Sequence, residues 1–140
     1  MNSCVLFSGG LDSAVLLALE RQTFARVWPV HVRAGLGWEP PEADAIARLL
    51  ASPPFAGRIE PLIALTVDMR DVYPADHWAV QGRPPAYDTP DEDVYLEGRN
   101  IVLISKAAVV CARLGVERLG LGPLAGNPFP RATPQFFAAM

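Results

Sequence analysis

The chain has 140 residues, of which 51% are hydrophobic and 19% charged, and its formal net charge at pH 7 is −3. This composition excludes a disordered or fibrous protein and predicts one globular domain with a full core. The arginines are scattered and form no basic stripe, which disfavours nucleic acid as a partner. No apolar stretch reaches the roughly 18 residues of a membrane span, and no cleavable leader precedes the first predicted strand. We therefore expect a cytoplasmic protein without membrane contact.

The first elements alternate between a short apolar run and a helical pattern. Residues 3–7 predict a strand, and residues 11–22 predict a helix. The apolar face of that helix is expected to comprise Leu11, Ala14, Val15, Ala18 and Leu19. A second strand is predicted over residues 26–32, where Pro29 removes one backbone donor and favours a free edge or a bulge.

The same alternation continues through the rest of the chain. A helix is predicted from the proline pair at 40–41 to residue 50, and a third strand over residues 59–67. Residues 73–97 are rich in proline and acidic side chains and predict a long functional loop rather than a core element. An apolar helix over 101–114 and a strand over 116–121 follow. Short strands alternating with helices predict a doubly wound α/β domain spanning residues 1–140, with a mainly parallel five-stranded sheet and helices on both faces.

The last residues predict a short helix that begins at Thr133 and Pro134, a capping residue followed by a favoured first-turn residue. A helix of about seven residues is marginal alone, and its aromatic side chains Phe136 and Phe137 need cover. We therefore expect either a protein truncated at its C-terminus or a homodimer or partner that covers this end.

The residues between the first strand and its helix, Ser8–Ser13, read SGGLDS and predict a pyrophosphate cradle. Two glycines let backbone N–H groups approach an anion, hydroxyls add donors, and the next helix presents its positive dipole end. The loop of kinases and GTPases requires a lysine here, yet Lys106 is the only lysine in the chain. The dinucleotide fingerprint fails too, because the glycines are adjacent. A simple glycine turn, with the helix capped by Asp12 or Ser13, is the structural alternative.

Metal ligands are sparse. Asp12 is the best candidate for Mg²⁺, because magnesium in nucleotide sites takes one or two carboxylates plus phosphate oxygens, although it could equally be a helix cap. An acidic cluster in the long loop could supply another ligand or a substrate contact, or could merely be solvated: Asp88, Asp91, Glu92, Asp93 and Glu97. Cys4 and Cys111 are expected to be buried small hydrophobes, and His31 and His77 lack a metal-binding spacing.

A second group of candidates, Gly98-Arg99-Asn100, stands before the predicted helix 101–114. Asn100 is placed to cap this helix, and capping explains that residue as well as function does. Capping explains Arg99 poorly, because a cation at a helix N-terminus opposes the dipole. A guanidinium beside the first loop would stabilise the negative charge that develops on a leaving pyrophosphate.

Taken together, Ser8–Ser13, Tyr95–Asn100 and the segment 122–137 resemble the 7-cyano-7-deazaguanine synthase family of PP-loop ATP pyrophosphatases, which act in queuosine biosynthesis. The resemblance implies the PP-loop fold and an ATP-dependent ligase. Such an enzyme converts 7-carboxy-7-deazaguanine and ammonia to the nitrile through an acyl-adenylate, with release of AMP and pyrophosphate. Two alternatives stay open: another PP-loop enzyme that thiolates or amidates tRNA or a small metabolite, and a non-catalytic ATP-binding module.

The resemblance also implies a set of site residues. The ATP phosphates would be held by Ser8, Gly9, Gly10, Leu11, Asp12 and Ser13, with Mg²⁺ on Asp12 and the adenine beside Val30, His31 and Val32. The substrate side would comprise Glu97, Gly98, Arg99 and Asn100, and the catalytic residues would be Asp12 and Arg99. Family members carry a four-cysteine zinc site in a further tail, which this chain lacks, and residues 31–38 depart from the family's aspartate-tyrosine-glycine pattern.

Overall fold

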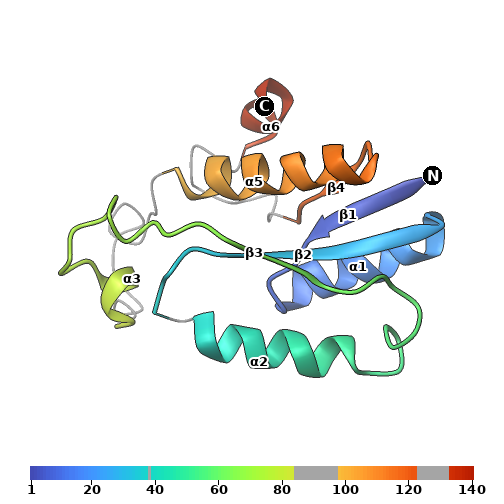
Figure 1. The fold of residues 1–140 in the computed structure, drawn as a ribbon, viewed down its shortest axis with the longest axis horizontal. Coiled ribbons are helices and arrows are strands. Elements are labelled where there is room, and N and C mark those ends of the chain that lie inside the picture. Colours follow the sequence, from blue (N-terminus) through green and yellow to red (C-terminus); the bar gives the residue numbers. More distant parts are fainter. Residues whose placement is uncertain (38, 84–97, 123–132) are drawn as a thin grey trace.

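The computed structural model describes residues 1–37, 39–83, 98–122 and 133–140. Within these ranges four strands form one parallel sheet in the order β3-β2-β1-β4 (Figure 1). The strands are β1 (Asn2–Leu6), β2 (Arg26–Arg33), β3 (Ile63–Thr66) and β4 (Leu119–Gly120). The predicted α/β class and parallel sheet are confirmed. The expectation of five strands is not met in the described part of the chain, because each of its four apolar runs supplies one strand.

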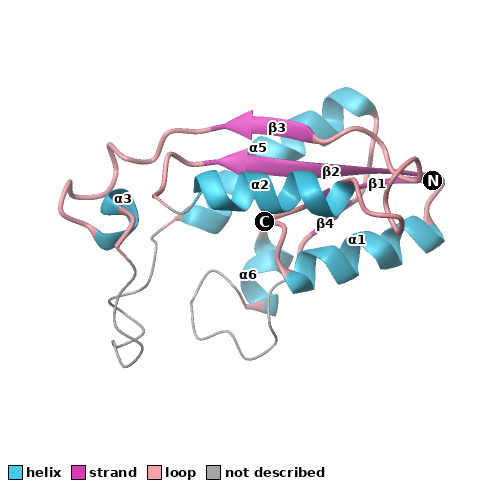
Figure 2. Cartoon of the chain, turned by 90° about the horizontal axis from the view of Figure 1, so that it is seen from below, coloured by secondary structure: helices cyan, strands magenta, loops and turns pink. Residues whose placement is uncertain are grey.

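Helices cover both faces of this sheet, as predicted. Helices α1 (Leu11–Thr23) and α2 (Glu39–Leu50) lie on one face, and α5 (Arg99–Leu114) lies on the other (Figure 1). Seen from below, α1 and α2 lie side by side and run roughly along the strands (Figure 2). Two short helices, α3 (Trp78–Gln81) and α6 (Pro134–Ala139), lie outside these layers. The layers place the start of α1 and the start of α5 at the same end of the sheet.

Alternation along β1 divides the core into two clusters. Cys4 and Leu6 pack with side chains of α5 on one face of the sheet, whereas Val5 and Phe7 pack with α1 and α2 on the other. Cys4 is fully buried against Cys111, and this burial raises the pKa of the Cys4 thiol to about 12. Both cysteines are free and buried, which confirms their prediction as small core side chains.

Pro29 lies at a position with one free side, as predicted, although its strand is not at the edge of the sheet. β2 is central, between β1 and β3, and Pro29 pairs with Val5 of β1. The ladder with β3 begins only at Val30, which pairs with Ile63. A proline is tolerated in this central strand because the ladder with β3 does not yet include its position.

The predicted apolar face of α1 is confirmed for Ala14 and Ala18, which pack against the core, and is wrong for its three larger residues. Leu11, Val15 and Leu19 are 79%, 51% and 54% exposed, whereas the buried positions of this helix are Ser13, Leu17 and Glu20. Glu20 accepts from the Ser3 hydroxyl at 2.6 Å and from two nitrogens of Arg118 at 2.8 Å each. These partners lie across the helix–sheet interface, so satisfying the buried carboxylate sets the rotation of α1.

The starts of α5 and α6 test two predicted caps. Gly98, with φ of +70°, is the N-cap of α5, and Asn100 lies inside the first turn, so the prediction of Asn100 as the cap is wrong. Thr133 caps α6 as predicted, because its hydroxyl oxygen accepts from the backbone N–H of Phe136 at 3.2 Å. The rings of Phe136 and Phe137 are half-buried and meet edge to face with centroids 5.3 Å apart.

The first part of the predicted long loop, residues 73–83, is more ordered than its composition suggests. Tyr73 and Ala79 are buried in a small cluster with Ala34, Leu36 and Met69. The prediction of a segment without core residues is therefore wrong for this part, and residues 84–97 lie outside the described ranges. None of the described helices has the length and apolar character required to cross a membrane.

Candidate active site

The strand order reverses at β1, which has β2 on one side and β4 on the other. In doubly wound sheets, ligands bind outside the carboxyl ends of the strands at such a reversal. A cavity of about 290 Å³ opens there. It is lined by ten of the predicted site residues, namely Ser8, Gly10, Leu11, Asp12, Ser13, Val30, His31, Val32, Arg99 and Asn100. Gly9 and Gly98 do not line it, and Glu97 lies outside the described ranges.

Hydroxyl groups hold the loop after β1 in shape. The Ser8 backbone N–H donates to Ser13 Oγ at 3.3 Å, and the two hydroxyls lie 3.2 Å apart. Ser13 Oγ donates to the Gly10 carbonyl at 3.2 Å, and the Gly10 N–H donates to Ser8 Oγ at 3.3 Å. The loop is therefore closed on itself before any ligand arrives, and a preformed site loses less freedom on binding.

The start of α1 has no side-chain cap. Gly10 is the N-cap, and glycine has no side chain that could accept from the first N–H groups of the helix. The alternative in which Asp12 or Ser13 caps the helix is therefore wrong. The first N–H groups of a helix lack intrahelical partners and carry positive partial charge. At α1 they adjoin the cavity, where an anion would satisfy them.

Position 9 requires glycine because α2 lies close to it, and not because of the cavity. Its φ is +81°, and a Cβ atom there would lie 2.8 Å from Cγ1 of Ile46 in α2. Both the left-handed backbone and the close approach of α2 require glycine. Gly9 thus lets the loop pack closely against α2, and the phosphate contact that the resemblance implies for it stays a prediction.

Arg99 and Asn100 reach the same cavity from the opposite face of the sheet. They occupy the first turn of α5, and both are partly buried. Arg99 is close enough to His31 and Glu42 to influence the ionisation of both side chains. The fold therefore brings a guanidinium to the loop after β1 although some ninety positions separate them in the chain, as the sequence analysis expected.

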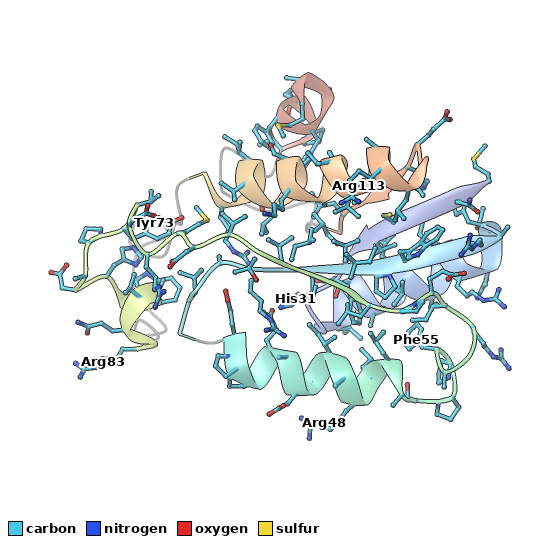
Figure 3. All side chains as sticks on the ribbon, in the orientation of Figure 1. His31, Arg48, Phe55, Tyr73, Arg83 and Arg113 are labelled. Atoms are coloured by element: carbon cyan, nitrogen blue, oxygen red, sulfur yellow. The ribbon has the colours of Figure 1, made fainter. Side chains whose placement is uncertain are left out.

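Glu42, on α2, is a cavity residue that the sequence analysis placed only in a helix. Burial raises the pKa of its carboxyl, with Arg99 opposing the shift and Glu39 adding to it. Its Oε2 lies 3.9 Å from Nε2 of His31, which is buried between β2 and α2 (Figure 3). Burial lowers the pKa of His31, so its imidazole is neutral at pH 7.

Glu39 anchors the chain between β2 and α2. Its carboxylate accepts backbone N–H groups of Ala34, Gly35 and Leu36 at 2.8–3.2 Å. This is the segment that departs from the family's aspartate-tyrosine-glycine pattern. Here a buried carboxylate from α2 shapes it, and the same helix is thereby held with Glu42 at the cavity.

The metal-binding capacity of the described residues is small. No group of three or more His, Cys, Asp or Glu side chains among them could hold a metal ion. Asp12 is exposed, lies in the first turn of α1 and lines the cavity. One carboxylate suits Mg²⁺ that takes most of its ligands from phosphate and water, whereas Cys4 and Cys111 are core side chains and line no metal site.

Comparison with known proteins identifies a family and a relative of the chain. The family model described as "Queuosine biosynthesis protein QueC" matches residues 2–140. The chain is 26% identical over 140 residues to "7-cyano-7-deazaguanine synthase 1" of Desulfitobacterium hafniense (strain Y51). That alignment covers 97% of this chain and 61% of the relative, so the chain spans less than two thirds of the relative's length.

Proposed function

Since the chain belongs to the QueC family of queuosine biosynthesis proteins, we propose that it acts as an ATP-dependent ligase. In this proposal it converts 7-carboxy-7-deazaguanine and ammonia to 7-cyano-7-deazaguanine, with release of AMP and pyrophosphate. The name of the Desulfitobacterium relative supports this substrate class. The single structural observation that supports the chemistry is the cavity that joins the Ser8–Ser13 loop, the end of β2 and Arg99.

ATP is a substrate of this reaction, and three groups of residues would bind it. The N–H groups at the start of α1 and the Ser8 hydroxyl would donate to the phosphates, the Ser13 hydroxyl would join them by releasing the Gly10 carbonyl, and the adenine would lie along Val30 to Val32. Asp12 would hold Mg²⁺, which neutralises charge on the phosphates when bound. Arg99 approaches the β- and γ-phosphates, where its planar fork can contact two oxygens.

The first chemical step is adenylylation. An oxygen of the substrate carboxylate attacks the α-phosphorus, and the bond to the bridging oxygen breaks, so that pyrophosphate leaves with the electron pair. Arg99 and the α1 N–H groups stabilise the charge that grows on the leaving group, an effect that is largest in the transition state. Asn100, Gly98 and Glu97 are proposed to contact the deazaguanine.

Amination and dehydration follow. Ammonia attacks the acyl carbon, the bond to AMP breaks, and loss of a proton leaves the amide. The amide oxygen then attacks the α-phosphorus of a second ATP and expels pyrophosphate. Departure of AMP with the oxygen and loss of the two N–H protons form the nitrile.

The test is to identify the products formed from ATP. We expect AMP and pyrophosphate whose release depends on 7-carboxy-7-deazaguanine, measured by chromatography of labelled nucleotide and by a coupled pyrophosphate assay. Release of ADP and phosphate would contradict the proposal. Calorimetric binding of ATP without turnover would identify a nucleotide-binding module instead, and turnover with only a different carboxylate would identify another PP-loop enzyme.

A further inference from the structure

His31 holds a buried nitrogen that the proposed steps above do not use. The side chain is 5% exposed, and its Nδ1 lies 3.0 Å from the carbonyl oxygen of Phe7. A carbonyl can only accept, so Nδ1 carries the proton and donates. In the neutral imidazole Nε2 is then an acceptor, and this buried atom has no hydrogen-bond partner in the described part of the chain.

Glu42 presents a second acceptor to the same point. Its Oε2 lies 3.9 Å from His31 Nε2, which is too far for a hydrogen bond between the two groups. Both residues line the cavity. Two buried acceptors facing one another are unfavourable unless a donor lies between them, because an unsatisfied buried polar atom costs about 1–3 kcal/mol.

We propose that His31 Nε2 and Glu42 Oε2 together bind ammonium, which becomes the ammonia of the reaction proposed above by giving one proton to the Glu42 carboxylate; this inference rests on that proposed reaction. A single nitrogen can lie at hydrogen-bond distance, roughly 2.9 Å, from both atoms and donate one N–H to each. A larger base would be poorly accommodated between acceptors so close together. Ammonium also supplies the positive charge that a buried carboxylate requires.

Two carboxylates and two guanidinium groups surround this point. Burial is the largest influence on both side chains, lowering the pKa of His31 and raising that of Glu42. Glu39 from α2 attracts positive charge, while Arg33 on β2 and Arg99 on α5 repel it. The carboxylate of Glu42 gains from a cation between it and the imidazole, because the cation offsets the cost of its burial.

The side-chain alternation of β2 separates this point from the proposed adenine contacts. Val30 and Val32 belong to the core cluster on the α5 face, whereas His31 lies on the α2 face. Ammonium between His31 Nε2 and Glu42 would therefore lie on the opposite side of β2 from the side chains of Val30 and Val32. It would remain in the cavity that holds the phosphate loop, from which it can reach an acyl-adenylate.

Matched substitutions at His31 isolate the acceptor. In His31→Asn the amide nitrogen can still donate to the Phe7 carbonyl but the Nε2 acceptor is gone, whereas His31→Gln can place an oxygen near that position. We expect the KM for ammonium to rise at least roughly tenfold in His31→Asn and in Glu42→Gln, and less in His31→Gln. In Glu42→Gln, the KM for ATP and the ammonium-independent pyrophosphate release should change less than about twofold, whereas the His31 variants are compared only for ammonium because His31 is also a proposed adenine contact. An unchanged KM for ammonium in both His31→Asn and Glu42→Gln would overturn the inference.

Two further measurements separate this inference from the proposed function. Pyrophosphate release without ammonium tests adenylylation alone, so its absence in the unmodified protein contradicts the proposed function.

Binding is read independently from the ¹⁵N resonance of His31 Nε2 during titration with ammonium or with potassium, a cation of similar size without N–H donors. A saturable shift with ammonium alone supports the site and should vanish in Glu42→Gln. The same response to both cations, or to neither as for a bridging water, overturns it. Thermal unfolding of each variant identifies any that fails to fold. If one of His31→Asn and Glu42→Gln fails to fold, the KM for ammonium of the other decides whether the inference holds.

Discussion

Two helices begin at the cavity, and their first turns differ in charge. Both α1 and α5 have a glycine N-cap, Gly10 and Gly98, so neither helix has a capping hydrogen bond from the side chain of its N-cap residue. The first turn of α1 contains Asp12, whose negative charge agrees with the helix dipole. The first turn of α5 contains Arg99, whose positive charge opposes the dipole.

This difference shows which residue needs a functional explanation. A carboxylate at a helix N-terminus is stabilising by itself, so the position of Asp12 is explained without a ligand. An arginine there costs stability unless an anion or another partner compensates for it. Arg99 interacts with the buried carboxylate of Glu42, so the protein compensates part of its charge, and the proposed pyrophosphate contact rests on the place of Arg99 in the cavity lining.

Among the substitutions at these two first turns, Arg99→Ala is expected to have the largest effect. We expect pyrophosphate release to fall by roughly 10²-fold or more, because removal of one preorganised electrostatic contact costs about that much in other active sites. The free energy of unfolding should change by less than about 1 kcal/mol, because the loss of an unfavourable dipole interaction and the loss of the attraction to Glu42 oppose each other. Arg99→Lys is the control that keeps the charge without the planar fork. Unchanged turnover in Arg99→Ala would remove this residue from the mechanism.

Asp12→Ala should also lower pyrophosphate release by roughly 10²-fold, if the carboxylate holds Mg²⁺ against the phosphates. In contrast to Arg99→Ala, it should lower the free energy of unfolding by about 0.3–1 kcal/mol, because a favourable dipole interaction is lost. Turnover as a function of Mg²⁺ concentration and chemical denaturation measure the two effects. A loss of stability with wild-type turnover would leave Asp12 a purely structural residue.

Two glycines in the left-handed region extend the comparison to the backbone. Gly9→Ala should destabilise the protein by about 2–5 kcal/mol, since unfavourable φ adds to the contact with Ile46. Gly98→Ala should cost only about 1–2 kcal/mol, because nothing lies within 4 Å of its added Cβ. Denaturant titration of both variants measures the difference. Equal losses would show that α2 does not constrain the phosphate loop.

The smallest expected effects are on the pH dependence of the free energy of unfolding. They differ between Glu20, which lies outside the cavity, and Glu42, which lines it. Arg118 lowers the pKa of Glu20, so its contribution to stability is present above the unfolded pKa near 4.5 and is lost as pH falls through the folded value. Burial raises the pKa of Glu42, so stability is instead lost as pH rises from about 4.5 through its folded value. Glu20→Gln should therefore destabilise by about 1–3 kcal/mol at pH 7 and less in acid. Glu42→Gln should remove a loss of stability above pH 4.5. Unfolding measured from pH 3 to 8 would contradict this if both variants gave parallel curves.

Much of the cavity follows from local patterns. The apolar run of β1, the SGGLDS turn and the next helix are contiguous, so hydrophobic periodicity and glycine chemistry predicted their structure directly. The start of α5 near the same cavity followed from a general rule, since parallel strands have their carboxyl ends at one edge. No local signal indicated Glu42, which reaches the site only because α2 packs against β2.

The sequence by itself determined the class of fold, the phosphate loop and the two charged first turns, because each depends on neighbouring residues. Tertiary structure decided which face of α1 is buried, since the Glu20–Arg118 pair joins positions 98 residues apart and leaves Leu11, Val15 and Leu19 exposed. It likewise decided that the proline-bearing β2 is central and that His31 meets Glu42. These features depend on which distant surfaces pack together, and the balance of burial and polar pairing that selects them is set only in the assembled core.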